Sequence, residues 1–414
     1  MRRTSTDYAN PYRPLPIRLA NTVGRGLGGW AWPSFAPDDL MAAAARAEGL
    51  GDFGDGSFRP ALQVLVNSIE SEANLHPVGA KITRDRLVAA LRNRLRLQEW
   101  HRMHPDPQGV PLSGPIVITG LQRTGTTLLH RLLASDPRLR ALQSWEAMNP
   151  APLRGEPLGA PWRIAEARKA ERGLAYVAPD FFAVHPVQHD APEEEVMVLD
   201  HSFYSTVPEA ILRVPTYSSW LEEQDQTPGY RYLNRALKML GHGGSEERWL
   251  LKTPHHLEYI DTLFAVFPGA RVIHTHRDPL QTLGSFCSMV AHGRGVFSDA
   301  IDPVEIGRQW GRKTGRMVSR ALASRAHLDP AHFHDVRYGD LVADPMAQIR
   351  GVYDFLGMDL PAEVLTGIEE TRARTPQHRH GKHLYSLAAF GLDEAQIDAL
   401  FGPYRDRFRS NSDA

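Results

Sequence analysis

The sequence predicts an α/β protein with three layers and a mostly parallel central sheet, joined to an N-terminal helical region and a helical insertion. Three observations support this fold class. From residue 115 onward, short apolar runs alternate with segments of helical periodicity. The apolar runs are continuous, as in strands that are buried on both faces of a parallel sheet. The first run leads directly into a glycine-bearing loop and a helix, a typical start of an α/β domain.

The strands of this sheet are expected in five short apolar runs, at residues 115–119, 140–143, 249–251, 271–275 and 333–338. Helical patterns separate them, so each strand pairs in parallel with a neighbour through a helical crossover. The long interval at about 155–248 is mainly helical and interrupts this alternation. We therefore expect it to be an insertion that caps the site.

The N-terminal part divides into an arm and a set of helices. Residues 1–36 are rich in proline, glycine and arginine, and residues 37–105 have apolar residues at helical spacing. We expect residues 1–110 to pack on a domain formed by residues 111–414. A G-x-G-x-x-G pattern at residues 24–29 lacks a preceding strand and a following helix, so it does not predict a dinucleotide site.

The arm is basic, with five arginines and a single acid, Asp7, in residues 1–36. The simplest interpretation is an arm that packs on the domain. The alternative is a weak contact between the arm and an anionic or membrane surface.

Composition excludes several classes of protein. The 414 residues carry a formal net charge of -1, which argues against a nucleic-acid partner. Cys287 is the only cysteine, so the chain has no intrachain disulfide and no cysteine-based metal cluster. No apolar segment reaches the length of a membrane span and the first residues lack a signal-peptide core, so we expect a cytoplasmic protein.

The loop that follows the first strand, GLQRTGTT, almost matches the phosphate-binding pattern G-x-x-x-x-G-K-[ST]. Gly120 and Gly125 have the required spacing, but Thr126 stands where the lysine is expected. Free backbone N–H groups at the start of the following helix would still bind an anion. The positive charge comes from Arg123 within the loop, which suits a shorter anion held close to the backbone.

The motif R-T-G-T-T after a strand resembles the 5′-phosphosulfate loop of sulfotransferases that use 3′-phosphoadenosine-5′-phosphosulfate (PAPS). Three further segments resemble this family in the same order. They are WLLKTPHHL with its strand-end lysine, VIHTHRDPLQTLGSF, and VRYGDLVADP. Elements such as LLKTPHHL and LYSLAAFGL look most like the bacterial long-chain branch.

This resemblance implies a P-loop-like core, PAPS as cosubstrate and no metal ion. Arg277 and Ser285 match the residues that hold the 3′-phosphate, and Tyr338 matches a neighbour of the adenine. Lys382 lies in the C-terminal region where the family often places a basic loop. The loop residues implied to bind PAPS are Arg123, Thr124, Gly125, Thr126 and Thr127.

Sulfuryl transfer requires a base for the acceptor's proton and cations for the charge that develops on the leaving phosphate. Arg123 and Lys252 are the expected cations. We expect Glu146, which follows the second strand, to be the base. His255 and His256 remain alternatives. The family's Lys-Thr-His segment has Pro254 at the matched position here, which argues against a histidine base, but His255 is the next residue.

Two other functions stay open at this point. A P-loop-type kinase would need a substitute for the missing lysine and acids that bind Mg²⁺, and a catalytically silent nucleotide-binding protein would need neither. The acceptor is a hydroxyl or an amine. The long helical insertion and the apolar N-terminal arm point to a lipophilic alcohol or a lipid, and a carbohydrate or a small phenol stays open. The sequence does not indicate the oligomeric state.

Overall fold

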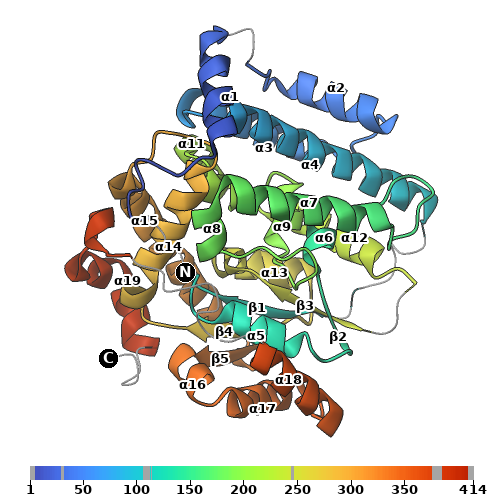
Figure 1. Ribbon diagram of the computed structural model, residues 1–414. Coiled ribbons are helices and arrows are strands. Elements are labelled where there is room, and N and C mark those ends of the chain that lie inside the picture. Colours follow the sequence, from blue (N-terminus) through green and yellow to red (C-terminus); the bar gives the residue numbers. More distant parts are fainter. Residues whose placement is uncertain are drawn as a thin grey trace.

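A five-stranded parallel sheet in the order β2-β3-β1-β4-β5 forms the centre of the molecule (Figure 1). This computed structural model describes residues 5–28, 32–105, 112, 114–243, 247–374 and 385–408. All five expected strands are present, and no expected bound is wrong by more than two residues. The strands are β1 (Ile116–Gly120), β2 (Leu139–Ala141), β3 (Arg248–Lys252), β4 (Arg271–His276) and β5 (Phe333–Arg337).

Side-chain alternation along the strands separates two cores, one on each face of the sheet. In β1, Ile116 and Ile118 contribute to one core and Val117 to the other. One face is covered by α5 (Thr126–Leu133), α16 (Tyr338–Ala343), α17 (Pro345–Leu356) and α18 (Ala362–Arg374). The other is covered by α12 (Thr227–Leu240), α13 (Ile260–Val266), α14 (Pro279–Gly295), α15 (Pro303–His327) and α19 (Glu394–Phe408). The predicted three-layer α/β fold is confirmed.

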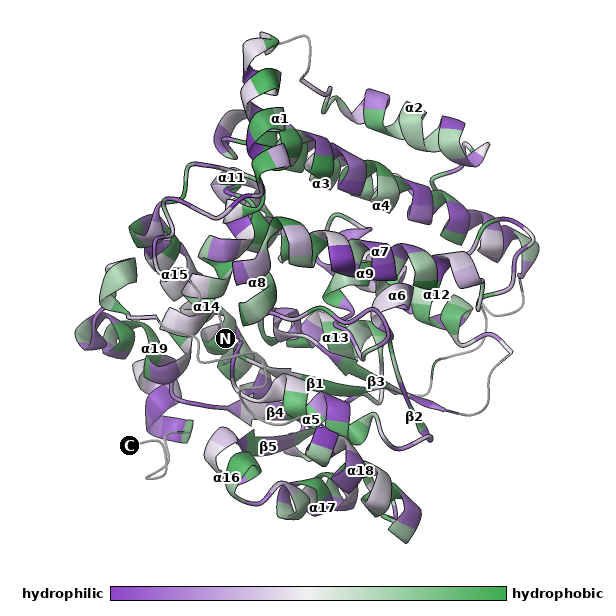
Figure 2. Ribbon diagram, viewed as in Figure 1, coloured by the Kyte–Doolittle hydropathy of each residue, from purple (hydrophilic) through white to green (hydrophobic). Residues whose placement is uncertain are grey.

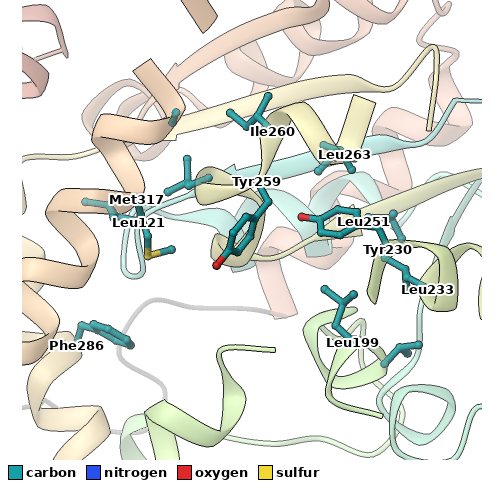
Figure 3. Packing of buried hydrophobic residues seen from close by; sticks show 14 of the residues in the cluster. Leu121, Leu199, Tyr230, Leu233, Leu251, Tyr259, Ile260, Leu263, Phe286 and Met317 are labelled. Atoms are coloured by element: carbon teal, nitrogen blue, oxygen red, sulfur yellow. The ribbon is translucent and has the colours of Figure 1, made fainter. Parts of the chain in front are cut away.

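The second core contains tyrosines as well as aliphatic residues. Figure 3 shows Tyr230 of α12 near Leu251 of β3, with Tyr259 and Ile260 at the start of α13. Tyr230 is fully buried and its hydroxyl oxygen lies 2.7 Å from Nδ1 of His256. Polar pairs of this kind let buried tyrosines contribute area without leaving an unpaired hydroxyl.

The N-terminal helices pack on the helical insertion. Phe58 and Leu65 share a separate core with Phe203 and Tyr217, which belong to the insertion. The N-terminal elements are α1 (Leu15–Gly26), α2 (Pro37–Glu48), α3 (Phe58–Glu72) and α4 (Pro77–Met103). The insertion contains α7 (Pro161–Val177), α8 (Pro179–Val184), α9 (Val196–Asp200), α10 (Val207–Ile211) and α11 (Pro215–Glu223) before α12. A boundary at residues 110–111 stays a prediction.

Two N-terminal features differ from what the sequence pattern indicates: the start of helix α4 and the presence of helix α1. Helix α4 begins at Pro77, where the His76 ring accepts a hydrogen bond from the Gly79 N–H and caps the helix. Helix α1 was not expected, because its prolines and glycines are typical of an arm. It ends at the G-x-G-x-x-G pattern, which is therefore no strand-to-helix loop. In the described part of the chain, no helix has both the length and the apolar character needed to span a membrane.

Candidate functional site

The loop between β1 and α5 borders a cavity of about 600 Å³ at the carboxyl ends of the strands. The cavity wall is strongly basic: it includes four arginines and one carboxylate, that of Glu194. Its residues are Gln122, Arg123, Gly125, Thr126, Thr127, Leu128, Arg131, His185, Glu194, Pro254, Arg277, Met289, Tyr338, Val342, Pro345 and Arg372. A cavity with this charge and size suits an anionic nucleotide.

The loop has the backbone conformation of an anion-binding turn. Arg123 has φ 70° and Gly125 has φ 89°, so the chain turns sharply before the first residues of α5. The hydroxyl of Thr124 donates to the Leu121 carbonyl at 2.6 Å and lies 2.7 Å from the hydroxyl of Thr275. The Thr124 side chain therefore ties the loop to β4, whereas Thr126 and Thr127 line the cavity.

Arg123, Arg277 and Tyr338 lie together beside this loop, although they are far apart in the sequence. Arg277 Nη1 donates to the Arg123 carbonyl at 3.1 Å. The guanidinium carbon of Arg277 lies 4.1 Å from the centre of the Tyr338 ring, a cation–π distance. Burial, followed by the charge of Arg277, lowers the pKa of Arg123. Because both arginines line the cavity, their positive charges favour an anion beside the loop.

Lys252, the last residue of β3, is held by two consecutive glutamates from the insertion. Its Nζ donates to Glu194 Oε1 at 2.6 Å, and its backbone N–H donates to Glu195 Oε2 at 2.8 Å. Glu195 also lies 2.6 Å from Nε2 of His256. The sequence PEEEVMVLDHSF at residues 192–203 predicts a helix with an acidic first turn. The helix, α9, begins at Val196, and the acids before it contact the end of β3.

The expected base Glu146 lies in a different environment. It is the third residue of α6 (Ser144–Met148), where it accepts the Gln143 N–H at 3.0 Å in a capping box. It also accepts a hydrogen bond from Arg140 Nη2 at 2.8 Å. Glu146 is buried and is not one of the residues that line the cavity.

His255 and His256 are both buried in the short helix η3 (Pro254–Glu258). Burial holds the pKa of His255 well below its usual range. His256 lies between Glu195 and Tyr230. Pro254, the residue before them, lines the cavity, whereas the two histidines do not.

His185 is a cavity residue whose role the sequence did not indicate. It follows α8, and its half-buried ring lines the cavity together with Arg123 and Glu194. Burial lowers its pKa; Lys252 and Arg123 lower it further, whereas Glu193 and Glu194 oppose the shift. In the sequence, His185 and His189 are four residues apart, a spacing that by itself is only a weak indication of a metal site.

Two other expected residues, Ser285 and Lys382, are not among the described residues that line the cavity. Ser285 is buried in α14, one turn before the cavity residue Met289, and does not itself line the cavity. Lys382 lies outside the described residues.

The described residues contain a group with metal-ligand chemistry, formed by His274, His276 and Asp335. Arg325 donates to both oxygens of Asp335, at 2.6 and 2.9 Å. His276 Nε2 lies 2.8 Å from the same carboxylate. Because the carboxylate is already shared between Arg325 and His276, a metal ion would have to displace the arginine. We assign this group a structural role beneath Arg277.

Comparison with protein families identifies the sulfotransferase family, whose model matches residues 115–362. A curated relative is the omega-hydroxy-beta-dihydromenaquinone-9 sulfotransferase Stf3 of Mycobacterium bovis, which is 29% identical over 258 residues. The match covers 59% of this chain and 63% of the relative. The chain therefore aligns with less than two thirds of that protein.

Two solved structures match over most of their length. Sulfotransferase STF1 from Mycobacterium tuberculosis is 34% identical, with a TM-score of 0.79 over 89% of this chain and 98% of its own. Sulfotransferase STF9 from Mycobacterium avium is 27% identical, with a TM-score of 0.80 over 91% of this chain and 97% of its own. Both likenesses extend beyond the sheet to the N-terminal helices and the insertion, because they cover so much of the chain.

Proposed function

The chain belongs to the sulfotransferase family, and we propose that it transfers the sulfuryl group of PAPS to the hydroxyl group of a lipophilic alcohol. The observation that carries this proposal is the cation in the loop. Arg123, rather than a lysine after Gly125, provides the positive charge and faces the cavity beside Arg277. A triphosphate loop needs the lysine to reach the β- and γ-phosphates, whereas a single 5′-phosphosulfate does not.

PAPS would be held at both ends by residues of this chain. The backbone of the loop and the hydroxyl groups of Thr126 and Thr127 would bind the 5′ end, at the positive end of the α5 dipole. Arg277 would bind the 3′-phosphate, with Tyr338 close to the adenine. Ser285, Lys382 and the backbone of Thr124 remain proposed contributors.

When bound, PAPS supplies the sulfuryl group, and the protein's residues manage charge and the acceptor proton. Arg123 and Lys252 stabilise the negative charge that develops on the leaving phosphate. The positioning residue for Lys252 is Glu194, whose carboxylate accepts the Nζ hydrogen bond. Glu194 thereby keeps the ammonium group at the end of β3.

We assign the role of general base to His185 in place of Glu146. The support is that His185 lines the cavity and that its lowered pKa keeps the imidazole neutral near pH 7, so one nitrogen can accept the acceptor's proton. Both oxygens of Glu146 already accept hydrogen bonds outside the cavity. The hydroxyl proton passes to His185 as the new S–O bond forms and the S–O bond to the phosphate breaks.

A lipophilic alcohol suits the remaining wall of the cavity. Leu128, Met289 and Val342 line it together with the basic residues. The relative Stf3 is named for an omega-hydroxylated dihydromenaquinone, a long lipophilic alcohol. We propose an acceptor of this chemical class.

Ligand-dependent thermal stability tests the donor. The protein would be melted in EDTA with the product 3′-phosphoadenosine-5′-phosphate (PAP), with ADP or with ATP. PAP at about 100 times its Kd should stabilise the protein by about 2.7 kcal/mol, and ADP at the same concentration should stabilise it much less. An equal shift with ADP, or a shift that needs Mg²⁺ and ATP, would favour a kinase instead.

Arg271, the first residue of β4, and Arg277, the residue just after the strand ends, provide a matched pair of variants for the 3′-phosphate. Arg277→Ala should weaken PAP binding about tenfold or more while ADP binding changes little, because a charged hydrogen bond contributes about 1.5–3 kcal/mol. Arg271→Ala, at the opposite end of the same strand, where Nη1 donates to the Ala331 carbonyl, should leave both affinities unchanged. Titration calorimetry measures both. Equal losses for PAP and ADP in Arg277→Ala would show that this residue does not recognise the 3′-phosphate.

A further inference from the structure

Helix α1 exposes a line of large aliphatic side chains, the α1 stripe, formed by Leu15, Leu19, Val23 and Leu27. Their exposed fractions are 58%, 57%, 61% and 57%. Each residue follows the previous one by four positions, so the side chains occupy one face of the helix and its C-cap. Exposed apolar patches of this regularity mark an interaction surface.

The face of α1 opposite the stripe packs on α4, so the stripe faces away from the rest of the molecule. Asn21 is buried, and its Oδ1 accepts the Val78 N–H at 3.0 Å. A Cβ atom at Gly24 would lie 2.6 Å from Cβ of Pro77, so the backbone of α1 is in close contact with the proline ring at the start of α4. Figure 1 shows α1 projecting at the top of the molecule, away from the sheet, and Figure 2 shows hydrophobic bands along it.

The charges around the stripe are positive. Arg18 and Arg25 are exposed on the same helix, and α1 contains no acidic residue. Arg25 and Arg13 both pair with Asp299, so their charges are partly neutralised. The first 36 residues of the sequence contain five arginines and one acid. Such a charge balance complements a negatively charged surface.

Exposed aromatic residues flank the stripe on both sides in the sequence. Tyr12 and Trp32 are each 45% exposed. Tyrosine and tryptophan favour the headgroup level of a bilayer, where the ring is partly apolar and its polar atom reaches water. An apolar helix face with arginines and flanking aromatics is the pattern of a helix that lies in a membrane surface.

We propose that the α1 stripe inserts into the surface of an anionic lipid bilayer and holds the protein there. The arm also contacts the far end of a cavity helix: Arg13 Nη2 donates to the Ser298 carbonyl at 2.7 Å and to that of Gly295, the last residue of α14. Helix α14 carries Met289 to the cavity wall. We infer that this attachment gives the cavity access to an alcohol in the membrane, and this role rests on the proposed function. The attachment itself does not depend on the proposed function.

Vesicle flotation of the full chain tests the proposal. The protein would be mixed with vesicles of phosphatidylcholine containing phosphatidylglycerol, and with vesicles of phosphatidylcholine alone. We expect it to float with the anionic vesicles and much less with the neutral ones. The double variant Leu19→Glu/Val23→Glu should float about tenfold less. The control Tyr176→Glu/Val304→Glu, which places two glutamates at exposed apolar positions elsewhere, should float like the wild type.

Three outcomes would overturn the proposal. The first is that the wild type does not float, and the second is that the α1 variant floats as well as the wild type. The third is that the wild type does not float but forms a dimer without lipid in sedimentation velocity, whereas the α1 variant is a monomer. The last would mean that a second copy of the chain covers the stripe. The milder Leu19→Ser/Val23→Ser is the alternative if the glutamate variant does not fold. The PAP-induced thermal shift should be the same in every variant, so loss of flotation with an intact shift separates this proposal from the proposed function.

Discussion

Thr126 takes the place at which nucleoside-triphosphate loops carry a lysine, and the residues around it explain how the loop functions without one. Arg123 lies within the loop at φ 70°, a conformation that is uncommon for a residue with a side chain. Its carbonyl accepts a hydrogen bond from Arg277, which fixes the turn at a second point. The charge that a lysine would bring from the helix therefore comes from the turn itself.

His185→Gln tests the proposed base at this scale. Glutamine keeps a polar side chain of similar reach but cannot accept a proton, so kcat/KM should fall about 10²–10⁴-fold while the affinity for PAP is retained. Steady-state kinetics and calorimetry give the two values. An activity close to that of the wild type would exclude His185 as the base.

Glu146→Gln is the matched control for this variant. Glutamine removes the carboxylate that accepts hydrogen bonds in the capping box and in the ion pair with Arg140. The free energy of unfolding should therefore fall by about 1–3 kcal/mol, while kcat/KM changes little. If kcat/KM instead fell as far as expected for His185→Gln, Glu146 would be the base after all.

The pH profile tests the same assignment independently. His185 must be unprotonated to accept a proton, and its pKa lies below the ordinary value of 6.5. The kcat/KM profile should therefore stay level through pH 7 and fall only below pH 6.5, as His185 gains a proton. His185→Gln should lose this acid limb. An acid limb that persists in the variant would assign it to another group.

The residues that gather beside the loop could be predicted from the sequence, whereas the proposed base and the carboxylate that holds Lys252 could not. Arg123, Arg277 and Tyr338 belong to short local motifs at strand ends, so their convergence follows from the parallel sheet. Glu194 and His185 belong to the insertion, and their positions depend on how that segment packs on β2 and β3. Glu193 N–H donates to the Leu142 carbonyl at 2.8 Å, a contact between distant residues that no local pattern indicates.

At the scale of elements, the junction of β1 and α5 shows why glycines occupy two positions of the loop. A Cβ atom at Gly120 would overlap the Thr275 hydroxyl, and one at Gly125 would lie 3.0 Å from the Tyr338 ring. Gly125 also has a left-handed backbone. The spacing of the two glycines thus reflects close packing of the loop against β4 and α16.

Gly125→Ala, compared with Gly357→Ala, should separate the loss of stability caused by a left-handed backbone from the loss of PAP affinity caused by a Cβ atom in the loop. Gly357 also has a left-handed backbone, φ 65°, but a Cβ there would meet no atom within 4 Å. Alanine at either position should destabilise the fold by about 1–2 kcal/mol, and only Gly125→Ala should also weaken PAP binding, by about tenfold. Chemical denaturation and calorimetry measure the two effects. Equal PAP affinities in the two variants would contradict the proposed contact between the loop and the nucleotide.

The elements themselves were predicted unevenly. All five strands were recognised because each lies next to a turn or a helix. Burial on both faces makes β1 almost continuously apolar, whereas the edge strand β5 has buried Phe333 and Val336 but exposed polar residues between and after them. Helix α1 was missed because Pro16, Gly24 and Gly26 lower its local helical preference. It is held in place by contacts with α4 and Asp299, which local propensity does not reveal.

At the scale of the whole molecule, the sheet, the helical insertion and the N-terminal helices pack together, and the cavity lies between the sheet and the insertion. The sheet brings Arg123 and Arg277 to the cavity wall. At the end of β3 it also holds Lys252, which does not itself line the cavity, against the cavity residue Glu194. The insertion supplies His185 and Glu194 from above, and it shares its own core with the N-terminal helices. The proposed nucleotide contacts therefore come from the sheet and the loop after β1, whereas the proposed base comes from the insertion.

The formation of a sulfate ester is the most direct test of this account. The protein would be incubated in EDTA with PAPS and an omega-hydroxylated lipophilic quinone, and the products followed by mass spectrometry. We predict equal amounts of PAP and of the alcohol sulfate, and loss of both in Arg123→Gln. Failure to form the sulfate with any lipophilic alcohol while PAP still binds would contradict the proposed acceptor class, and phosphoryl transfer from ATP that requires Mg²⁺ would contradict the proposed reaction.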